Sequence, residues 1–450
     1  YFLLKHLTGA GRTDCDHWHD GAGLLPHHAA FTLEMEQSLQ SINPSVTIPY
    51  WEYGMDAYLY SNLADSPMFA KDFLGEMNPS NDEHRIDDGS FWSNVKIPRA
   101  DRLSSWSLKD TGSLNPYKNA YGAMRSPWNN NPSSYIGRHN TTYDISRYAT
   151  VPECSILQPC YQSDSLSLMN YCLNGNTHGP VHIMIGGAWG DEKEISDGEY
   201  SYLLGANRIL FFKILWRMGY TRCPEVCEVS SFDSCRCSVP DQYIEKYGAK
   251  KILTDSNIVS VISARLSSAT DDDYLNILRI VEHPGAAGEM FTSAAPFDPT
   301  FWPLHGSMER MVGLKRLNVD SGKESFDESW GYTEYDPTDG AAYLPGVCDW
   351  SRVSSVTDLT LPTCDLEAEC EGHGADDILE FSNFLNRGET YTNMDFYKFL
   401  HPNNLELPYV YDTYDFDYCS SYGYDFFDKS QSKGSKALRE GAKKDIPSAM

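Results

Sequence analysis

The chain has 450 residues, enough to bury one large hydrophobic core or two smaller ones. Its 36 basic and 63 acidic residues give a formal net charge of −27, which repels phosphate backbones and argues against nucleic-acid binding. Hydrophobic residues make up 41% and aromatic residues 13% of the chain, a composition typical of globular proteins. No apolar run approaches the roughly 20 residues that cross a bilayer, so we expect no membrane span. Because of the negative charge, we also expect no nucleic-acid partner.

Most of the 12 cysteines gather in three loop-like stretches, around residues 154–172, 223–237 and 348–370. This clustering favours disulfide bonds and an oxidising compartment. Asn140 begins an Asn-Thr-Thr sequon for N-glycosylation, which points the same way. The sequence opens at Tyr1 without a methionine or a signal peptide, which indicates a processed or an incompletely represented N-terminus. We therefore expect a secreted, extracellular glycoprotein with disulfides.

The first half of the sequence predicts two helices separated by a long irregular stretch. Apolar and charged residues recur with helical spacing over residues 28–40, and Asn43-Pro44 follows as a stop. From about residue 54 to residue 170, small polar residues, proline and tyrosine predominate, which predicts loops with short helices. A second helix is expected to begin near His178 and to end at Gly186-Gly187.

The second half predicts further helices and a long C-terminal region. Residues 195–219 and 254–282 have helical patterns on either side of a cysteine cluster. The chain after residue 317 is acidic and rich in tyrosine. From Lys429 it becomes a Ser/Lys/Gly tail that we expect to be flexible.

Histidines in two parts of the chain carry the strongest functional signal. His19 precedes His28 by nine residues, and His178 precedes His182 by four. Residues four apart lie on one helix face, so His178 and His182 can reach one metal ion. The glutamate of the zinc-protease motif HExxH is missing, and an HxxxH pair alone is common in cores and on surfaces. Together with His305, the two sets of imidazoles indicate two transition-metal ions.

These motifs resemble those of the type 3 copper proteins, the family of tyrosinases, catechol oxidases and molluscan haemocyanins. In that family the first copper site has a histidine nine residues before a second one, which opens a helix of the pattern WHRxxLxxFE. His19 and His28 have this spacing. The register of the helix is kept by Phe31, Leu33, Glu34 and Glu36. Residues 49–53, Pro-Tyr-Trp-Glu-Tyr, are similar to the family's following PYWDW.

The second copper site of the family is similar to the downstream histidines. Its HxxxH motif with a trailing glycine pair resembles His178, His182 and Gly186-Gly187. Its closing motif, DPxFWxHHxxxDR, is similar to residues 298–310, with His305 at the metal-binding position. The resemblance thus implies five copper ligands, which are His19, His28, His178, His182 and His305.

The sixth ligand implied by the resemblance lies upstream of the other two histidines of the first site. We assign it provisionally to His6 rather than to His17, which is only two residues from His19. His27 stands where the family has tryptophan, so we expect a packing role for it. Some members link a cysteine two residues before the second histidine to that imidazole by a thioether. Here Cys15 lies four residues before His19, which favours a disulfide instead.

The resemblance implies a mainly α fold: a four-helix bundle that holds two copper ions in a dinuclear type 3 centre, with long loops, an inserted cysteine-rich helical subdomain and an irregular C-terminal region. It also implies a tyrosinase-like polyphenol oxidase that uses O2 as co-substrate to oxidise a small phenolic substrate, an o-diphenol, to a quinone. One alternative is a haemocyanin-like oxygen-binding protein. Another is an extracellular structural or matrix protein that takes part in protein assembly, which the 29 tyrosines favour.

Two positions bear on the substrate. Many phenol-hydroxylating members carry asparagine after the first histidine of the second site, where this chain has Gly179. They also often carry a carboxylate nine residues before that histidine, where this chain has Met169. Both differences favour catechol oxidase over monophenol hydroxylase activity.

The 122 residues between His182 and His305 exceed the few tens that are usual in the family, so we predict an insertion. The predicted organisation is a tyrosinase-like copper-binding domain at 1–189 and 283–317, an inserted subdomain at 190–282, an acidic C-terminal region at 318–428 and a tail at 429–450. The four cysteines of the insertion fit a zinc site or two disulfides, and an oxidising compartment favours disulfides; they are Cys223, Cys227, Cys235 and Cys237.

Charged residues near the histidines are candidates for supporting roles. Asp298 and Glu309 are candidates to hold the second nitrogen of a copper-binding imidazole, although we favour the alternative that these charged residues form helix–helix ion pairs without a catalytic role. Arg310 is expected to pair with Glu34 or Glu36 and so to tie two helices together. In several family members a C-terminal segment plugs the active site, and Phe396, Tyr397 or Phe399 are the candidates here.

Overall fold

The structure is a computed structural model of the whole chain. It describes residues 1–10, 16–19, 22–86, 89–97, 118–119, 122–123, 131, 133–142, 151–190, 208–217, 220–221, 237–256, 258–259, 268–282, 285–330, 372, 374–381 and 389–428.

The described elements are mostly helical, as the resemblance predicts. The longer helical elements are α1 (Phe2–Ala10), α2 (Leu24–Gln40), α3 (Tyr53–Leu59), α4 (Cys154–Tyr161), α5 (Leu166–Cys172), the π-helical η4 (Leu173–His178), α6 (Gly179–Gly186), α9 (Arg208–Arg217), α10 (Asp241–Tyr247), α11 (Ala249–Asp255), α13 (Asp271–Val281), α14 (Phe301–Asp320), α15 (Asn393–Phe399) and α16 (Tyr418–Ser421). The short 3₁₀ turns are η1 (Leu63–Asp65), η2 (Pro67–Phe69), η7 (Glu289–Phe291) and η8 (Ala295–Phe297). The strands form two antiparallel pairs, β1 (Lys118–Asn119) with β2 (Gly122–Ala123) and β3 (Ala188–Trp189) with β4 (Ala286–Ala287).

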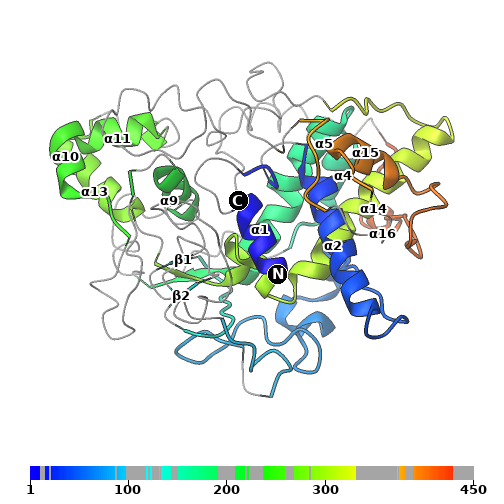
Figure 1. Ribbon diagram of the computed structural model, residues 1–450, viewed down its shortest axis with the longest axis horizontal. Coiled ribbons are helices and arrows are strands. Elements are labelled where there is room, and N and C mark those ends of the chain that lie inside the picture. The colour runs from blue at the N-terminus through cyan, green and yellow to red at the C-terminus, as the bar shows by residue number, and fades with distance from the viewer. Residues whose placement is uncertain are drawn as a thin grey trace.

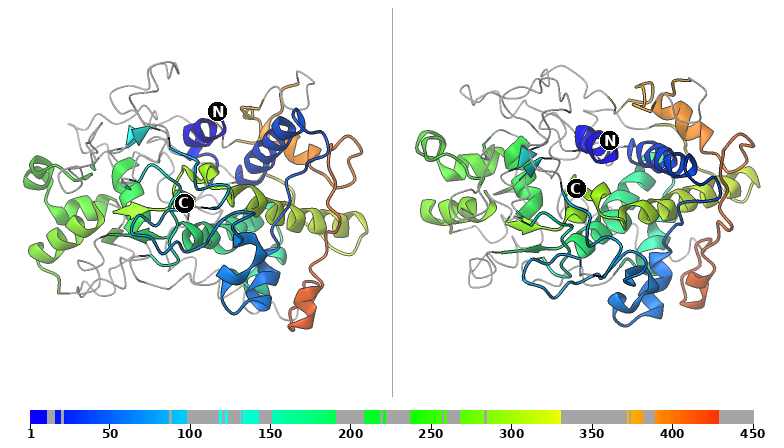
Figure 2. Two further views of the ribbon diagram at one scale, coloured as in Figure 1. Left: turned by 90° about the horizontal axis from the view of Figure 1, so that it is seen from below. Right: turned by 60° about the horizontal axis from the view of Figure 1, so that its bottom comes forward.

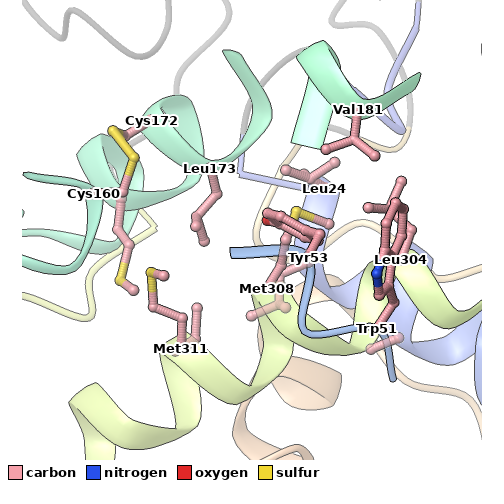
Figure 3. Close-up of a cluster of buried hydrophobic side chains, with 14 of the residues drawn as sticks. Leu24, Trp51, Tyr53, Cys160, Cys172, Leu173, Val181, Leu304, Met308 and Met311 are labelled. Atoms are coloured by element: carbon pink, nitrogen blue, oxygen red, sulfur yellow. A yellow bond between two sulfur atoms is a disulfide. The ribbon is translucent and has the colours of Figure 1, made fainter. Parts of the chain in front are cut away.

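The main core lies where α2, α5, α6 and α14 meet (Figure 1). Leu24 of α2, Val181 of α6 and Leu304 of α14 are each at most 2% exposed and point toward one another (Figure 3). Met308 and Met311 continue this buried face of α14 toward α5. Burying these side chains away from water stabilises the packing of α2, α6 and α14, the helices from which three predicted ligands come.

A second core forms among α9, α10, α11 and α13, at the left of Figure 1 and in both views of Figure 2. Ile252, Ile277 and Leu278 are buried there, and Thr270 and Asp273 form a capping box at the start of α13. A third, smaller cluster joins α9 to the main body, because Phe212 packs with Ile183 of α6, Phe291 and other residues. The helices of the predicted insertion therefore pack both on one another and on the copper domain.

The pair Gly186-Gly187 ends α6 as predicted, and its lack of side chains also permits a close backbone approach. Gly187 has a φ of +61°, and a Cβ there would lie 1.9 Å from the carbonyl oxygen of His139. A Cβ on Gly186 would lie 2.2 Å from the backbone nitrogen of Phe291. The two glycines thus let η7 pack directly against the end of α6.

The predicted elements agree with the described ones only in part. In the helix predicted at 254–282, residues 268–270 are not helical and α13 begins at Asp271; of the helix predicted at 195–219, α9 covers 208–217 and residues 195–207 lie outside the described residues. The first predicted helix ends at Gln40 as expected but begins at Leu24 rather than at residue 28. Helices α10 and α11 occupy residues 241–255, most of which the sequence pattern did not predict as helical. Among the described helices, none is long and apolar enough to span a membrane. The domain boundaries stay a prediction, and the tail at 429–450 lies outside the described residues.

Cysteines confirm the expected disulfides. Cys154 of α4 is bonded to Cys419 of α16, 265 residues away, and Cys160 is bonded to Cys172. Cys237 of the insertion is also disulfide-bonded, which excludes it as a zinc ligand. Cys15, Cys223, Cys227 and Cys235 lie outside the described residues.

Candidate metal centre

Five helical elements and one turn bring six histidines to one buried place. His6 comes from α1, His28 from α2, His178 and His182 from η4 and α6, His305 from α14, and His19 from the turn before α2. All six are at most 4% exposed. They are the six residues that the sequence singled out, although the first, His6, is 299 residues from the last, His305.

The nitrogen atoms fall into two groups that share a member. Ligand atoms of His6, His19 and His28 lie within 4.8 Å of one another, as do those of His28, His178 and His305. His182 is outside the second group, but its ring centroid is 4.4 Å from that of His178 and 5.7 Å from that of His305. Nε2 of His178 is 3.0 Å from Nε2 of His305, a separation suited to two ligands of one ion.

The ring of His28 joins the two groups, because it stacks on His305 with centroids 4.4 Å apart. The geometry therefore contains one continuous cluster of imidazoles rather than two separate sites. His17 belongs to neither group; its ring lies 5.2 Å from that of His27, which in turn packs on Trp18. This arrangement favours His6 over His17 as the sixth ligand and gives His27 the expected packing role.

Hydrogen bonds orient five of the six imidazoles. The Nδ1 atoms of four histidines are within 2.7–2.8 Å of backbone carbonyl oxygens, which pair His6 with Ser293, His28 with Leu24, His182 with Met290 and His305 with Phe301. A carbonyl only accepts a hydrogen bond, so each of these Nδ1 atoms carries the proton and each Nε2 keeps its lone pair. Nδ1 of His19 instead contacts the carboxylate of Asp16 at 2.9 Å.

Several of these lone pairs are buried without a hydrogen-bond partner. Within the described residues, Nε2 of His6, His28 and His182 has none. A buried polar atom without a hydrogen-bond partner costs free energy, so several such nitrogen atoms in one cluster indicate a site for a ligand. Neutral imidazole nitrogens of this kind are what a copper ion binds.

Burial also keeps five of the six histidines neutral. It holds the pKa values of His6, His28, His178 and His305 well below the usual range, and neighbouring imidazoles lower them further. Burial lowers the pKa of His182 to about 3. Because a protonated imidazole cannot bind a metal, these shifts keep the cluster ready for metal at neutral pH.

An apolar wall covers one side of the cluster. The ring of Phe301 lies 4.3 Å from that of His305, 5.3 Å from that of His6 and 6.0 Å from those of His28 and His182. Trp18 adds a contact to His6 at 5.0 Å. These rings exclude water from the side of the site that they cover.

The two carboxylates that the sequence proposed as partners of the imidazoles have other hydrogen-bond partners. Asp298 does not hold an imidazole: it accepts hydrogen bonds from Arg138, from the backbone N–H of Thr300 and from that residue's hydroxyl. Glu309 accepts hydrogen bonds from the hydroxyl groups of Tyr409 and Tyr411.

Arg310 pairs with Glu52, not with Glu34 or Glu36 as predicted. Glu34 pairs with Lys5 instead. Glu36 accepts hydrogen bonds from the backbone N–H of Ile48 and from the side chain of Gln40, which fixes the segment after α2.

Sequence reasoning missed the groups that hold the imidazoles. Four are main-chain carbonyls, which every residue type carries, so no residue pattern identifies them. The fifth, Asp16, lies three residues before His19 and also accepts the backbone N–H of that histidine at 3.1 Å. This local Asp-x-x-His spacing is the one signal that was available.

Residues 3–201 match the family model described as the common central domain of tyrosinase. The chain carries the central copper-binding domain of the tyrosinase family. It is 40% identical over 90 residues to the tyrosinase of Streptomyces lincolnensis, which is 20% of this chain and 29% of that protein. It is 27% identical over 174 residues to the tyrosinase of Gallus gallus, 37% of this chain and 28% of that protein. The matched parts span less than a third of these relatives' length.

The tyrosinase domain supplies a donor set that fits a dinuclear copper centre. Two triads of buried histidines, which share His28 in this geometry, offer nitrogen ligands and no carboxylate to the metal ions. Imidazole suits copper, whereas calcium and magnesium prefer oxygen ligands. The assignment of each of the six histidines to one of the two ions stays a proposal.

Proposed function

We propose that this chain is a copper oxidase that uses O2 to convert o-diphenols to o-quinones. Two diphenols each lose two electrons and two protons. One O2 takes up these four electrons and four protons to give two water molecules. The observation that carries the proposal is the cluster of six buried histidines, five of which lie within the residues that match the tyrosinase domain. His6, His19 and His28 are proposed to hold the first copper, and His178, His182 and His305 the second.

Bound copper would supply two adjacent one-electron centres, which together match the two-electron oxidation of a diphenol. The protein's part is to hold the ligands in place before metal binds. The carbonyls of Ser293 and Met290 fix the rings of His6 and His182, so that their Nε2 lone pairs face the site. Phe301 lies against both triads and excludes water between them.

We expect catechol oxidation rather than monophenol hydroxylation. Hydroxylation of a monophenol requires removal of its proton, for which a carboxylate or amide that orients a water is useful. Met169 is fully buried in the main core and has no such group, and Gly179 has no side chain. Both positions therefore support the diphenol as the substrate class.

The C-terminal aromatic residues give little support to a plug over the site. The ring of Phe396 packs with Tyr391 and Phe399. The hydroxyl of Tyr397 donates to Glu328 at 2.7 Å, while its carbonyl accepts from Arg316. The bond to Arg316 ties α15 to α14, and α15 also packs against α2.

The disulfides support an oxidising compartment, so we propose that the protein acts outside the cell. Asn140 is exposed, as a glycosylated asparagine must be. Digestion of protein from its native source with an N-glycosidase would lower the mass if this sequon is used, whereas an unchanged mass would contradict glycosylation.

Oxygen uptake by copper-loaded protein tests the proposal. With catechol we expect sustained consumption of one O2 for two catechols and the appearance of quinone; with the matching monophenol we expect a much lower rate. Reversible binding of O2 without turnover of catechol would indicate an oxygen carrier instead. Protein that takes up neither copper nor oxygen would favour the structural role.

A further inference from the structure

We propose that Lys213, in a helix of the predicted insertion, is a positioning residue for the first copper. It acts through Asp16 on His19, so that the inserted segment determines how firmly that copper is held. The inference rests on the proposed function, because it takes His19 as a ligand of the first copper.

The chain of contacts is short and buried. Nζ of Lys213 lies 2.7 Å from Oδ2 of Asp16, and Oδ1 of the same carboxylate lies 2.9 Å from Nδ1 of His19. Lys213 is 2% exposed, Asp16 is fully buried and His19 is 4% exposed. Asp16 also accepts the backbone N–H of His19, so it fixes the main chain and the ring together.

His19 differs from the other oriented histidines in its partner. Those partners are main-chain carbonyls, whose positions are set by helices and turns. A carboxylate on a side chain can rotate, so its orientation depends on what holds its second oxygen. Lys213 holds that oxygen, and a buried ammonium beside a buried carboxylate has a strong electrostatic reason to stay there.

Helix α9 is well placed to transmit this effect. Phe211, Ile214 and Leu215 lie in the core that α9 shares with α11 and α13. Phe212 packs in the cluster that contains Ile183 of α6 and Phe291 of η7. The helix therefore sits between the two cores, as Figure 1 shows for α9 between α13 and α1.

The same helix reaches both halves of the centre. Lys213 contacts the first half through Asp16. Phe212 packs beside Phe291, the residue after Met290, whose carbonyl holds His182 of the second half. A change in how α9 packs on α13 would thus alter the support of both copper sites, and Lys213 is its polar contact to the first.

Copper release from the full-length, copper-loaded chain tests the inference. Under reducing conditions, bathocuproine captures Cu(I), and the copper left on the protein is measured over time. We expect Lys213→Met to release one of its two copper ions about tenfold or more faster than wild type, the usual effect of removing a partner of a metal-binding imidazole. Lys213→Arg keeps the charge and should fall between the two.

A second buried pair provides the matched control. Lys315 lies 2.7 Å from Glu324, with side chains 1% and 5% exposed, and among the described residues neither side chain hydrogen-bonds to a histidine of the cluster. Lys315→Met therefore also leaves a buried carboxylate without its cation. We expect it to lower the stability against urea as Lys213→Met does, yet to release copper at the wild-type rate.

The double variant with Asp16→Asn separates a path through Asp16 from a general weakening. If Lys213 acts through Asp16, adding Lys213→Met to Asp16→Asn accelerates release little further. Equal release rates for Lys213→Met and Lys315→Met would overturn the inference, as would additive effects in the double variant. If Lys213→Met does not fold, the copper-release rates of Lys213→Arg and Asp16→Asn are compared with that of Lys315→Met instead, and equal rates would again overturn the inference. A wild-type chain that binds no copper would contradict the proposed function itself, a result distinct from either.

Discussion

The buried pair of Arg138 and Asp298 predicts a large loss of stability when the arginine is removed. Both side chains are fully buried, and Nε and Nη2 of Arg138 each lie 2.7 Å from a carboxylate oxygen of Asp298. The same guanidinium donates to the carbonyls of Leu74, Gly75 and Glu76. It therefore ties the loop at 74–76 to the residues that start α14, the helix of His305.

Arg138→Met keeps much of the length and the apolar stem but removes the charge. It leaves the carboxylate of Asp298 buried with only the N–H and hydroxyl of Thr300 as donors. Removing one member of a buried ion pair typically costs about 3–5 kcal/mol, and the three carbonyls lose their donor as well. We expect a loss of at least about 3 kcal/mol in the free energy of unfolding.

Urea unfolding followed by tryptophan fluorescence measures this loss. Lys251→Met is the control, because the side chain of Lys251 is 43% exposed and pairs with Asp255, four residues further along α11. Surface pairs contribute at most about 1 kcal/mol, so the control should change little. The double variant Arg138→Met/Asp298→Asn should regain part of the lost stability. A loss of under about 1 kcal/mol for Arg138→Met would refute the reasoning.

Three further predictions concern other parts of the fold. Replacing Cys154 and Cys419 together by alanine should cost about 2–5 kcal/mol, because their disulfide closes a long loop; an unchanged melting temperature would argue against it. Burial raises the pKa of Glu309 from 4.5 to about 7, so the unfolded chain loses this proton first and native stability falls by about 3 kcal/mol as the pH rises from 4.5 to 7. Glu309→Gln should remove this dependence of the unfolding free energy on pH, measured by urea unfolding at several pH values. The same pH dependence in the variant and the wild type would show that the carboxyl ionises freely when folded. Gly187→Ala should lower both stability and copper content, since its Cβ meets the carbonyl oxygen of His139; a variant with wild-type values would mean that the backbone relaxes there.

The sequence identified candidate copper ligands, whose role stays a proposal, because the spacing of metal ligands is local. His19 and His28 lie nine apart and His178 and His182 lie four apart, so each pair can be found in one short segment. The structure brings all of them and His305 together. His6 was the hardest to assign, since it comes from a separate helix, α1, and no neighbouring motif supports it.

The partners of these side chains were not predictable in the same way. Arg310 was expected to pair with a carboxylate of α2, but Glu52 lies nearer because the chain after α2 returns past α14. An arginine pairs with the acidic residue that packing brings near it. The spacing of charges along the sequence does not predict which residue that is. Lys213 and Asp16 are 197 residues apart, so their contact likewise follows from the fold alone.

The ratio of copper to protein in the purified, metal-loaded chain tests the central claim most directly. Six buried imidazoles in one cluster predict two copper ions per chain, measured by atomic absorption after removal of loosely bound metal. Alanine in place of His178 should lower the ratio toward one. A wild-type ratio near zero would contradict the dinuclear copper centre, and with it the oxidase.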